Sequence, residues 1–290
     1  MPLISPERLL GCIRRFAAFE RSRFRPFLCA GQRIGWVTHE FTALLGADPE
    51  VFEVGPTAVC LAARLDDVET RSQAVNQAVW RQRDQPWFRR WNDEYASVSA
   101  GRRDAAMLHL ARCATVPFGV RTYGAHVNGY VRDASGLRLW VAQRASGEPD
   151  FGGQLDTLVG GFVGAGLTPD HIAEKELGEE AGIDVERLRA PRAVGVVSGI
   201  RQETEGVRPF SIYCYDLELR SGEQPVNRDG EIEGFELLTV PQIVEQLEAG
   251  RFKFNAVWVV VDWLMRNGFV AAEGRQFVEL GGALRHWDPE

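Results

Sequence analysis

The sequence predicts an α+β protein made of two units, residues 1–118 and residues 119–290. The 290 residues are 45% hydrophobic, which is enough for a sizeable core in one or two domains. Strand patterns and helix patterns are interleaved along the whole chain, without an internal repeat or a low-complexity segment. Near Pro117 the pattern changes from short mixed elements to longer strands, and we expect the domain boundary there.

The first unit is expected to be a small α+β domain. Its predicted elements are a helix within residues 6–20, a hairpin of Phe24–Cys29 and Arg33–Val37, short strands at Val51–Val54 and Ala58–Ala62, and helices over Asp66–Gln82 and Arg102–Cys113. Five aromatic residues then follow closely on one another, namely Trp80, Trp87, Phe88, Trp91 and Tyr95. Such a cluster favours core or interdomain packing over ring stacking on a planar ligand.

The second unit is expected to surround one central helix with strands. Its predicted strands are Gly124–Arg132, Leu137–Arg144, Ala193–Ser198, Phe210–Leu219 and Gly234–Leu238, and further helices are predicted at Pro241–Leu247 and Asn255–Asn267. The strand Phe210–Leu219 shows the strongest alternation of apolar and polar residues. This order of elements fits several α+β folds, so the pattern alone does not choose among them.

The central helix of this unit has well-marked limits. Thr168 is a good N-cap, Pro169 suits the first helical position, where no amide donor is needed, and Gly182 suits the residue beyond the end. We therefore predict a helix over Pro169–Ala181, with Ala173, Leu177 and Ala181 as its apolar stripe.

Three carboxylates lie on one face of the predicted helix. Glu176, Glu179 and Glu180 are spaced i, i+3 and i+4, within an arc of about 100°. Taken alone, such a run is typical of a solvated helix face, where like charges repel by a few tenths of a kcal/mol per pair. The glycines and capping residues at fixed distances on both sides favour a second interpretation, in which a divalent cation joins the carboxylates. Mg²⁺ and Mn²⁺ both prefer such oxygen ligands.

The whole segment from Leu155 to Ile183 resembles the Nudix box, whose pattern is G-x5-E-x7-R-E-U-x-E-E-x-G-U, with U an aliphatic residue. The matching positions are Gly161, Glu176, Leu177, Glu179, Glu180, Gly182 and Ile183. Two positions depart from the pattern: Leu167 stands where the family has a glutamate, and Lys175 where it has an arginine. In the family these two residues commonly form a salt bridge that braces the loop on the helix. The departures put the brace in doubt and leave the metal carboxylates in place.

Further segments are similar to one subgroup of this family. They are G-A-H-V-N-G-Y-V at 124–131, L-D-T-L-V-G-G at 155–161, C-Y-D-L-E-L at 214–219 and D-G-E-I-E-G-F at 229–235. The subgroup includes the N-terminal part of fungal thiamine pyrophosphokinases and related plant and bacterial hydrolases. It also has an extra N-terminal domain, so the resemblance spans nearly the whole chain and implies a Nudix α/β/α sandwich with an added small α+β domain.

The resemblance implies Mg²⁺- or Mn²⁺-dependent hydrolysis of a diphosphate linkage by attack of water on phosphorus. By matched position, the metal ligands would be Glu176, Glu179, Glu180 and the backbone carbonyl of Gly160, with a further carboxylate from a later loop. Glu231 is the best residue for that role, with Asp229 and Glu233 as competitors and an ordinary turn as the other interpretation. Glu176 or Glu180 would instead act on the water as the catalytic base.

Four other polar residues are predicted to line the substrate pocket. Arg144 ends a strand just before the loop that leads to the box, where its guanidinium is suited to bind a phosphate, although a surface salt bridge explains it nearly as well. His126 and Asn128 alternate on one strand and so point to the same side, a pattern that also fits packing residues. Asp156 is expected to pair with these groups or with an aminopyrimidine-like ring.

The favoured substrate is a small organic diphosphate, with thiamine diphosphate or its oxidised analogues implied by the subgroup. The alternatives are an ADP-sugar or dinucleotide pyrophosphatase and a non-catalytic ligand-binding Nudix module, although such modules usually lack some of the box glutamates. An isopentenyl-diphosphate isomerase would need a histidine-rich metal site, and the five histidines here are scattered.

The composition limits the classes of binding partner and the cellular compartment that we expect. The chain has a net charge of -7 and no basic tract interleaved with aromatic residues, so nucleic acid is not an expected partner. Five scattered cysteines without a C-x-x-C pair fit a reducing compartment. No apolar run is long enough for a secretory signal or a membrane span, so we expect a cytoplasmic protein without a membrane partner, and a homodimer is left open.

Overall fold

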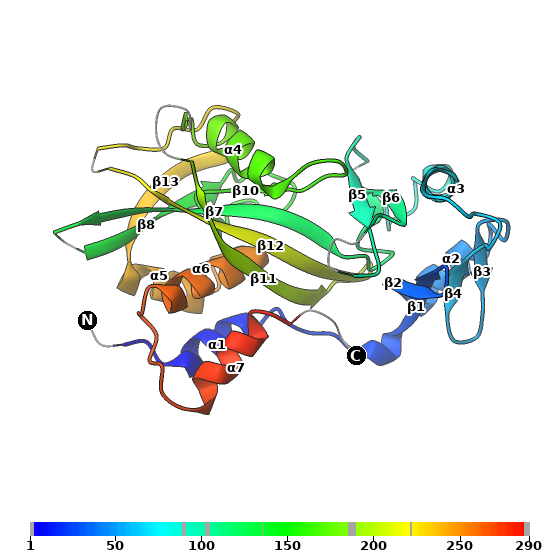
Figure 1. Cartoon of the computed structure of the whole chain (residues 1–290), viewed down its shortest axis with the longest axis horizontal. Coiled ribbons are helices and arrows are strands. Elements are labelled where there is room, and N and C mark those ends of the chain that lie inside the picture. The colour runs from blue at the N-terminus through cyan, green and yellow to red at the C-terminus, as the bar shows by residue number, and fades with distance from the viewer. Residues whose placement is uncertain are drawn as a thin grey trace.

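A computed structural model describes residues 3–88, 91–101, 105–134, 136–184, 190–220 and 222–286. Its elements are mixed α and β, as predicted, and they form a small N-terminal unit beside a larger unit built on a central sheet (Figure 1). No helix among the described residues is long and apolar enough to cross a membrane.

The N-terminal unit contains a four-stranded sheet of order β2-β1-β4-β3. Its strands are β1 (Phe24–Cys29), β2 (Gln32–Thr38), β3 (Phe52–Val54) and β4 (Val59–Leu61), and its helices are α2 (His39–Leu45) and α3 (Val68–Arg81). The predicted hairpin and the long helix are confirmed, whereas α2 was not predicted. Asp67 caps α3 by accepting a hydrogen bond from Thr70 N at 2.9 Å. The core of this sheet is aromatic, with Phe27, Phe41 and Phe118 fully buried.

The predicted helix over 102–113 is wrong within the described residues. Leu108–Ala111 is strand β6, which pairs with β5 (Tyr95–Val98), and Arg112–Ala114 is a single 3-10 turn. Leu108 and Leu110 are fully buried while His109 between them is half-buried. That alternation has the period of a strand, and the burial of the two leucines decides the conformation. Residues 102–104 lie outside the described part of the chain.

The aromatic cluster of the N-terminal unit is a packing feature. Phe88 is buried against Phe41, with ring centroids 5.8 Å apart, and Trp87 packs on the same ring at 5.9 Å. Trp80 and Trp91 form an edge-to-face pair at 5.0 Å. These contacts agree with the core-packing interpretation of the sequence.

The larger unit is organised around a seven-stranded sheet. Its main strand order is β11-β12-β7-β8-β13, with β10 paired to β7 and β9 paired to β8. The strands are β7 (Thr122–Asp133), β8 (Gly136–Arg144), β9 (Leu155–Asp156), β10 (Val159–Phe162), β11 (Arg192–Gln202), β12 (Val207–Glu218) and β13 (Ile232–Thr239). The central pair, β7 and β12, is parallel, and the other pairs are antiparallel. All five strands predicted for this unit are confirmed.

Helices cover both faces of this sheet (Figure 1). On one face, α4 (Pro169–Glu179) packs Ile172, Ala173 and Leu177 against Ala125 and Val127 of β7. On the other face lie α5 (Val240–Glu248) and α6 (Phe254–Arg266), with α1 (Pro6–Arg14) and α7 (Arg275–Ala283) packed beneath them. The sheet between two helical layers is the α/β/α sandwich that the resemblance implies.

Helix α1 joins the core of the larger unit. Its buried residues Leu9, Leu10 and Ile13 belong to the same hydrophobic cluster as Trp258 and Trp263 of α6. The start of the chain therefore lies under the second unit, and residues 15–23 lead from there to β1. The division at residue 118 stays a prediction.

Candidate active site

Helix α4 is fixed at its start by its own sequence. Thr168 Oγ1 accepts a hydrogen bond from His171 N at 3.2 Å, and Pro169 occupies the first turn, as predicted. Beyond the end of the helix, Gly182 has a φ of +64°, which favours glycine. A Cβ at this position would also lie 2.9 Å from the carbonyl oxygen of Val226, so the turn can hold only glycine without movement.

The glycine pair of β10 lies directly against the carboxylates of α4. Gly160 N donates to Glu180 Oε2 at 3.4 Å. A Cβ on Gly161 would lie 2.5 Å from Glu176 Oε1, so only glycine lets the strand approach this carboxylate. The structure therefore brings together Gly160, Glu176 and Glu180, three of the predicted site residues.

Glu180 is the buried member of the group. Its residue surface is 5% exposed. Burial, as the main cause, and the nearby carboxylates of Glu176, Asp156 and Glu231 together raise the pKa of Glu180 to about 8. The pKa of Glu176 is also raised, mainly by burial, although Lys175 opposes the shift. Negative charge is thus concentrated at a place where the protein supplies little compensating charge, which favours binding of a cation.

Glu179 is exposed and forms an ion pair with Lys175. The Lys175 ammonium lies 2.6 Å from Glu179 Oε2 and 3.5 Å from Glu176 Oε1. In the family pattern the basic residue here pairs with an earlier glutamate, but Leu167 stands at that position and is 40% exposed. Lys175, which lacks the family's glutamate partner, instead contacts two carboxylates of its own helix.

Glu231 approaches the site from the loop before β13. Its carbonyl oxygen accepts a hydrogen bond from Ala145 N at 2.8 Å, which ties this loop to the end of β8. Its carboxylate is exposed and close enough to raise the pKa of both Glu176 and Glu180. The competing acids are occupied elsewhere, because Asp229 accepts from Glu231 N and Glu233 accepts from Ser146. Glu231 remains the best candidate for the distal carboxylate.

His126 lies beneath Gly160 and is fully enclosed. Thr157 Oγ1 donates to the carbonyl of Val159, so it accepts from His126 Nδ1 at 2.8 Å. His126 Nε2 then accepts from the side-chain amide of Asn255 at 3.2 Å. Burial lowers the pKa of His126 to about 4, which keeps the ring neutral. A Cβ on Gly160 would lie 2.6 Å from the imidazole, so the ring packs directly against the glycine backbone.

Asp156 forms a buried ion pair with Lys253, a residue that the sequence analysis did not select. Lys253 Nζ donates to Asp156 Oδ2 at 2.9 Å, and the two side chains are 14% and 6% exposed. Burial opposes ionisation of Asp156, but the charge and hydrogen bond of Lys253, with the charge of Arg144, hold the pKa of Asp156 below its ordinary value. Backbone hydrogen bonds between Leu155 and residues 251 and 253 bring this lysine to β9.

Asn128 belongs to a different cluster. Its side-chain amide donates to Asp216 at 3.2 Å, and Asp216 in turn accepts two hydrogen bonds from Arg266. Asn128 has no exposed surface. Its complete burial and its hydrogen bond to Asp216 support a packing role, and its contact with substrate stays a prediction.

Arg144 lies beside the site and is partly held by its own loop. Its Nε donates to the carbonyl of Asp150 at 3.2 Å, and a terminal nitrogen contacts Glu148 at 3.3 Å. The guanidinium is close enough to lower the pKa of both His126 and Asp156. It therefore supplies positive charge near the carboxylates, as a phosphate-binding residue would.

The donor set fits a divalent ion by chemistry. Carboxylate oxygens of Glu176, Glu179, Glu180 and Glu231, with the Gly160 carbonyl, are the hard ligands that Mg²⁺ and Mn²⁺ take. Burial and the neighbouring carboxylates both disfavour ionised Glu180, and a bound cation would offset both effects. Within the described residues, no three His, Cys, Asp or Glu side chains already converge as a cage. Glu179 would have to leave Lys175 to complete the set.

Comparisons with known proteins give the class of this chain. A family model described as "NUDIX domain" matches residues 122–257, and one described as "Domain of unknown function (DUF4743)" matches residues 8–122. Nudix hydrolase 20, chloroplastic, of Arabidopsis thaliana is 30% identical over 275 residues, covering 91% of this chain and 74% of the relative. The chain therefore belongs to the Nudix hydrolase family, whose members use divalent metal ions and act on small-molecule diphosphates.

A second plant relative agrees with this assignment. Nudix hydrolase 24, chloroplastic, of the same plant is 30% identical over 268 residues, which cover 91% of this chain and 73% of the relative. The solved NUDIX domain of Shewanella oneidensis NrtR, complexed with ADP ribose, is 12% identical with a TM-score of 0.41. That match covers 52% of this chain and 90% of the solved one.

Proposed function

We propose that this hydrolase cleaves the diphosphate linkage of thiamine diphosphate or its oxidised analogues and releases the monophosphate and phosphate. The observation that carries the proposal is that Glu176 and Glu180 lie against the Gly160–Gly161 strand, with the Glu231 carboxylate close enough to raise the pKa of both. The thiamine assignment is supported by the segments around the box and by the N-terminal unit, both of which resemble one Nudix subgroup. Cytoplasmic localisation and a homodimer stay predictions from the sequence.

In this proposal, Glu176, Glu179, Glu231 and the Gly160 carbonyl would hold the divalent ion. When bound, the ion supplies positive charge to the non-bridging phosphate oxygens and makes the attacking water more acidic. Glu180 is the favoured proton acceptor, because it is the buried carboxyl of the group and its pKa is raised to about 8. Arg144 would bind the terminal phosphate through its guanidinium.

The buried residues below the carboxylates position the strand that carries Gly160. His126 supports Gly160 from beneath and binds Thr157, and Lys253 fixes the neighbouring Asp156. These groups are saturated by protein partners, so we assign them a positioning role. Direct contact of His126 and Asp156 with substrate stays a prediction.

The substrate proposal can be tested with a panel of diphosphates. Purified protein with Mg²⁺ would be incubated with thiamine diphosphate, oxidised thiamine diphosphate, ADP-ribose and a dinucleoside polyphosphate, and kcat/KM would be measured for each. We expect the thiamine compounds to have the highest kcat/KM. A higher value for ADP-ribose or the dinucleotide would replace the thiamine assignment with the second candidate, an ADP-sugar or dinucleotide pyrophosphatase, which the same carboxylates would serve.

A further inference from the structure

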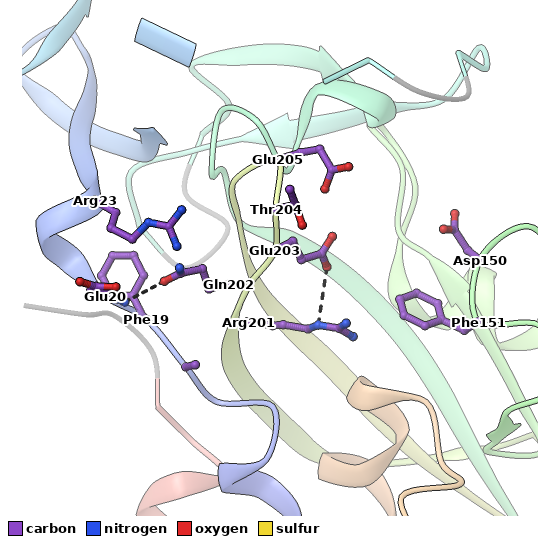
Figure 2. Close-up of a pocket in the computed structure, with 11 residues that line it drawn as sticks. Phe19, Glu20, Arg23, Asp150, Phe151, Arg201, Gln202, Glu203, Thr204 and Glu205 are labelled. Atoms are coloured by element: carbon purple, nitrogen blue, oxygen red, sulfur yellow. Dashed lines mark hydrogen bonds and ion pairs between the residues drawn. The ribbon is translucent and has the colours of Figure 1, made fainter. Parts of the chain in front are cut away.

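A cavity of about 990 Å³ lies apart from the carboxylate site. Its walls come from three segments: residues 18–23 after α1, the loop at Asp150 and Phe151, and residues 201–205 at the β11–β12 turn. Figure 2 shows Arg23 on one side of this space, Phe151 on the other and Arg201 between them. The cavity shares no lining residue with the Gly160–Glu180 site, and it lies where the N-terminal segment meets the Nudix unit.

Arg201 is the central charged group of this cavity. Its guanidinium carbon lies 4.9 Å from the ring centroid of Phe254, 5.5 Å from that of Phe151 and 5.8 Å from that of Phe16. All three rings lie within cation–π distance of the guanidinium, and an aromatic ring does not take the place of an oxygen acceptor for its N–H groups. Burial lowers the pKa of Arg201 from its ordinary value, but an arginine stays charged in proteins. A half-buried charge with aromatic neighbours needs an acceptor in the plane of its N–H groups.

Within the described part of the chain, no hydrogen bond supplies that acceptor. Among the described residues, the Arg201 side chain makes no hydrogen bond, and its one ion pair is with Glu203 at 4.0 Å, the outer limit of such a contact. Glu203 is already engaged by Arg208, which donates to it at 2.7 and 3.2 Å. On the facing wall, the Arg23 guanidinium has no hydrogen bond or ion pair to any residue in the described ranges.

The acidic residues of the lining do not change this conclusion. Four carboxylates and two guanidinium groups face the cavity, so charge alone would favour a cation. The carboxylates, however, have partners: Glu203 binds Arg208, Glu20 accepts from Ser22, and Asp150 and Glu205 each take part in a polar or electrostatic interaction. Among the described residues, the guanidinium groups of Arg201 and Arg23 face the cavity without a hydrogen bond, and an arginine can only donate.

Phe151 gives the cavity an apolar wall in an uncommon backbone conformation. Its φ of +60° is in the left-handed region, which bulky residues rarely adopt. The conformation is held by contact with Phe254, at 5.4 Å between ring centroids, and by the hydrogen bond from Gln154 N to the Phe151 carbonyl. Such strain is common where a side chain is held for binding. Phe19, half-buried on the opposite wall, provides a second aromatic surface.

We propose that this cavity is a second ligand site, which binds a phosphate-type oxyanion between Arg201 and Arg23 with an attached ring against Phe19 or Phe151. The site takes a monophosphate of an aromatic or heteroaromatic compound and does not require a divalent ion. Because it uses the segment that follows α1, it gives the N-terminal part of the chain a role in ligand binding. The inference does not rest on the substrate proposed above.

Calorimetric titration of the metal-free protein with phenyl phosphate and with inorganic phosphate tests this site. With EDTA present, we expect the wild type to bind phenyl phosphate with a Kd of about 1 mM or tighter and inorganic phosphate several-fold more weakly. Arg201→Met is expected to weaken binding of phenyl phosphate at least tenfold, and Arg23→Met about threefold to tenfold. Arg83→Met is the matched control, because Arg83 lies over the Trp80 ring outside the cavity.

Three results would overturn the proposal. They are no heat of binding for the wild type with either probe at 20 mM, an unchanged Kd in Arg201→Met, and loss of binding in Glu180→Gln with retention in Arg201→Met. The last result would place the phosphate at the carboxylate site. Thermal unfolding of each variant checks that folding is intact, and Arg201→Lys, which keeps the charge and loses the planar fork, is expected to bind with intermediate affinity. Equal affinities for the two probes would remove the ring-binding part of the proposal.

Discussion

Replacing Glu180 with glutamine measures how strongly the carboxylate site opposes folding when no metal is present. The pKa of Glu180 is raised from 4.5 to about 8, with burial as the main cause. Between these pH values the folded protein keeps the proton and the unfolded chain loses it, so the folded state binds more protons. Stability must therefore fall as pH rises through this window. The shift corresponds to a total of about 4 to 5 kcal/mol, taken as an upper bound.

Glutamine keeps the shape and the acceptor for Gly160 N but cannot ionise. In EDTA at pH 8, Glu180→Gln is expected to raise the free energy of unfolding by up to about 4 kcal/mol, whereas the gain at pH 5 is below about 1 kcal/mol. Denaturant unfolding at pH 5, 7 and 8 measures both values. Glu174→Gln is the control, because Glu174 is exposed on the same helix. Equal gains for Glu180→Gln at all three pH values, or no gain at pH 8, would refute the reasoning.

The remaining predictions address the groups around this carboxyl. Gly160→Ala is expected to cost about 1 to 3 kcal/mol of stability in thermal unfolding, because the new methyl group meets the imidazole of His126. Gly178→Ala, which has open space in α4, is the control and is expected to be neutral or stabilising in the same assay. Lys175→Met removes the ammonium group that competes with the metal ion for Glu179. Mn²⁺ binding, measured by electron paramagnetic resonance, is therefore expected to tighten about twofold to threefold. Unchanged or weaker Mn²⁺ binding would contradict competition between Lys175 and the ion. Lys253→Met leaves the buried Asp156 carboxylate unpaired and is expected to lower the free energy of unfolding by about 3 to 5 kcal/mol. Adding Asp156→Asn is expected to restore most of that loss. An additive loss in the double variant would argue against a coupled pair.

Local sequence signals predicted the helix of the site well. The expected range Pro169–Ala181 compares with the observed Pro169–Glu179, because the N-cap, the proline and the final glycine act on their own few residues. The one-sided spacing of Glu176 and Glu180 likewise follows from helix geometry alone. By contrast, the burial that separates Glu180 from the exposed Glu179 depends on β10, so the helical pattern could not distinguish them.

Contacts between distant segments were not predictable in the same way. Lys253 reaches Asp156 across 97 residues, and Asn255 reaches His126 across 129. One signal was nevertheless present, since Lys175 and Lys253 are the two lysines among 33 basic residues and both lie at the site. A lysine presents a compact charge, which fits a single carboxylate oxygen such as Asp156 Oδ2 better than an arginine fork does. From the sequence, Lys175 was noted only as a departure from the family pattern, and Lys253 was not selected.

The helix predicted at 102–113 failed for a related reason. A short apolar run with Leu108 and Leu110 fits both a helix and a strand by periodicity alone. Pairing with Tyr95–Val98 selects the strand, together with two hydrogen bonds to α3: the His109 carbonyl accepts from Asn76, and His109 N donates to Ser72 Oγ. Those partners lie outside any local window, so the choice depends on tertiary contacts.

The central claim is that the α4 carboxylates support Mg²⁺-dependent cleavage of a diphosphate. The most direct measurement is the rate of phosphate and monophosphate release from the best diphosphate substrate, with and without Mg²⁺, for the wild type, Glu179→Gln, Glu180→Gln and the control Glu174→Gln. We expect release that requires Mg²⁺, falls by about a hundredfold or more in the two site variants, and stays within about twofold in the control. Release that is independent of Mg²⁺, or equal in all four proteins, would contradict the account.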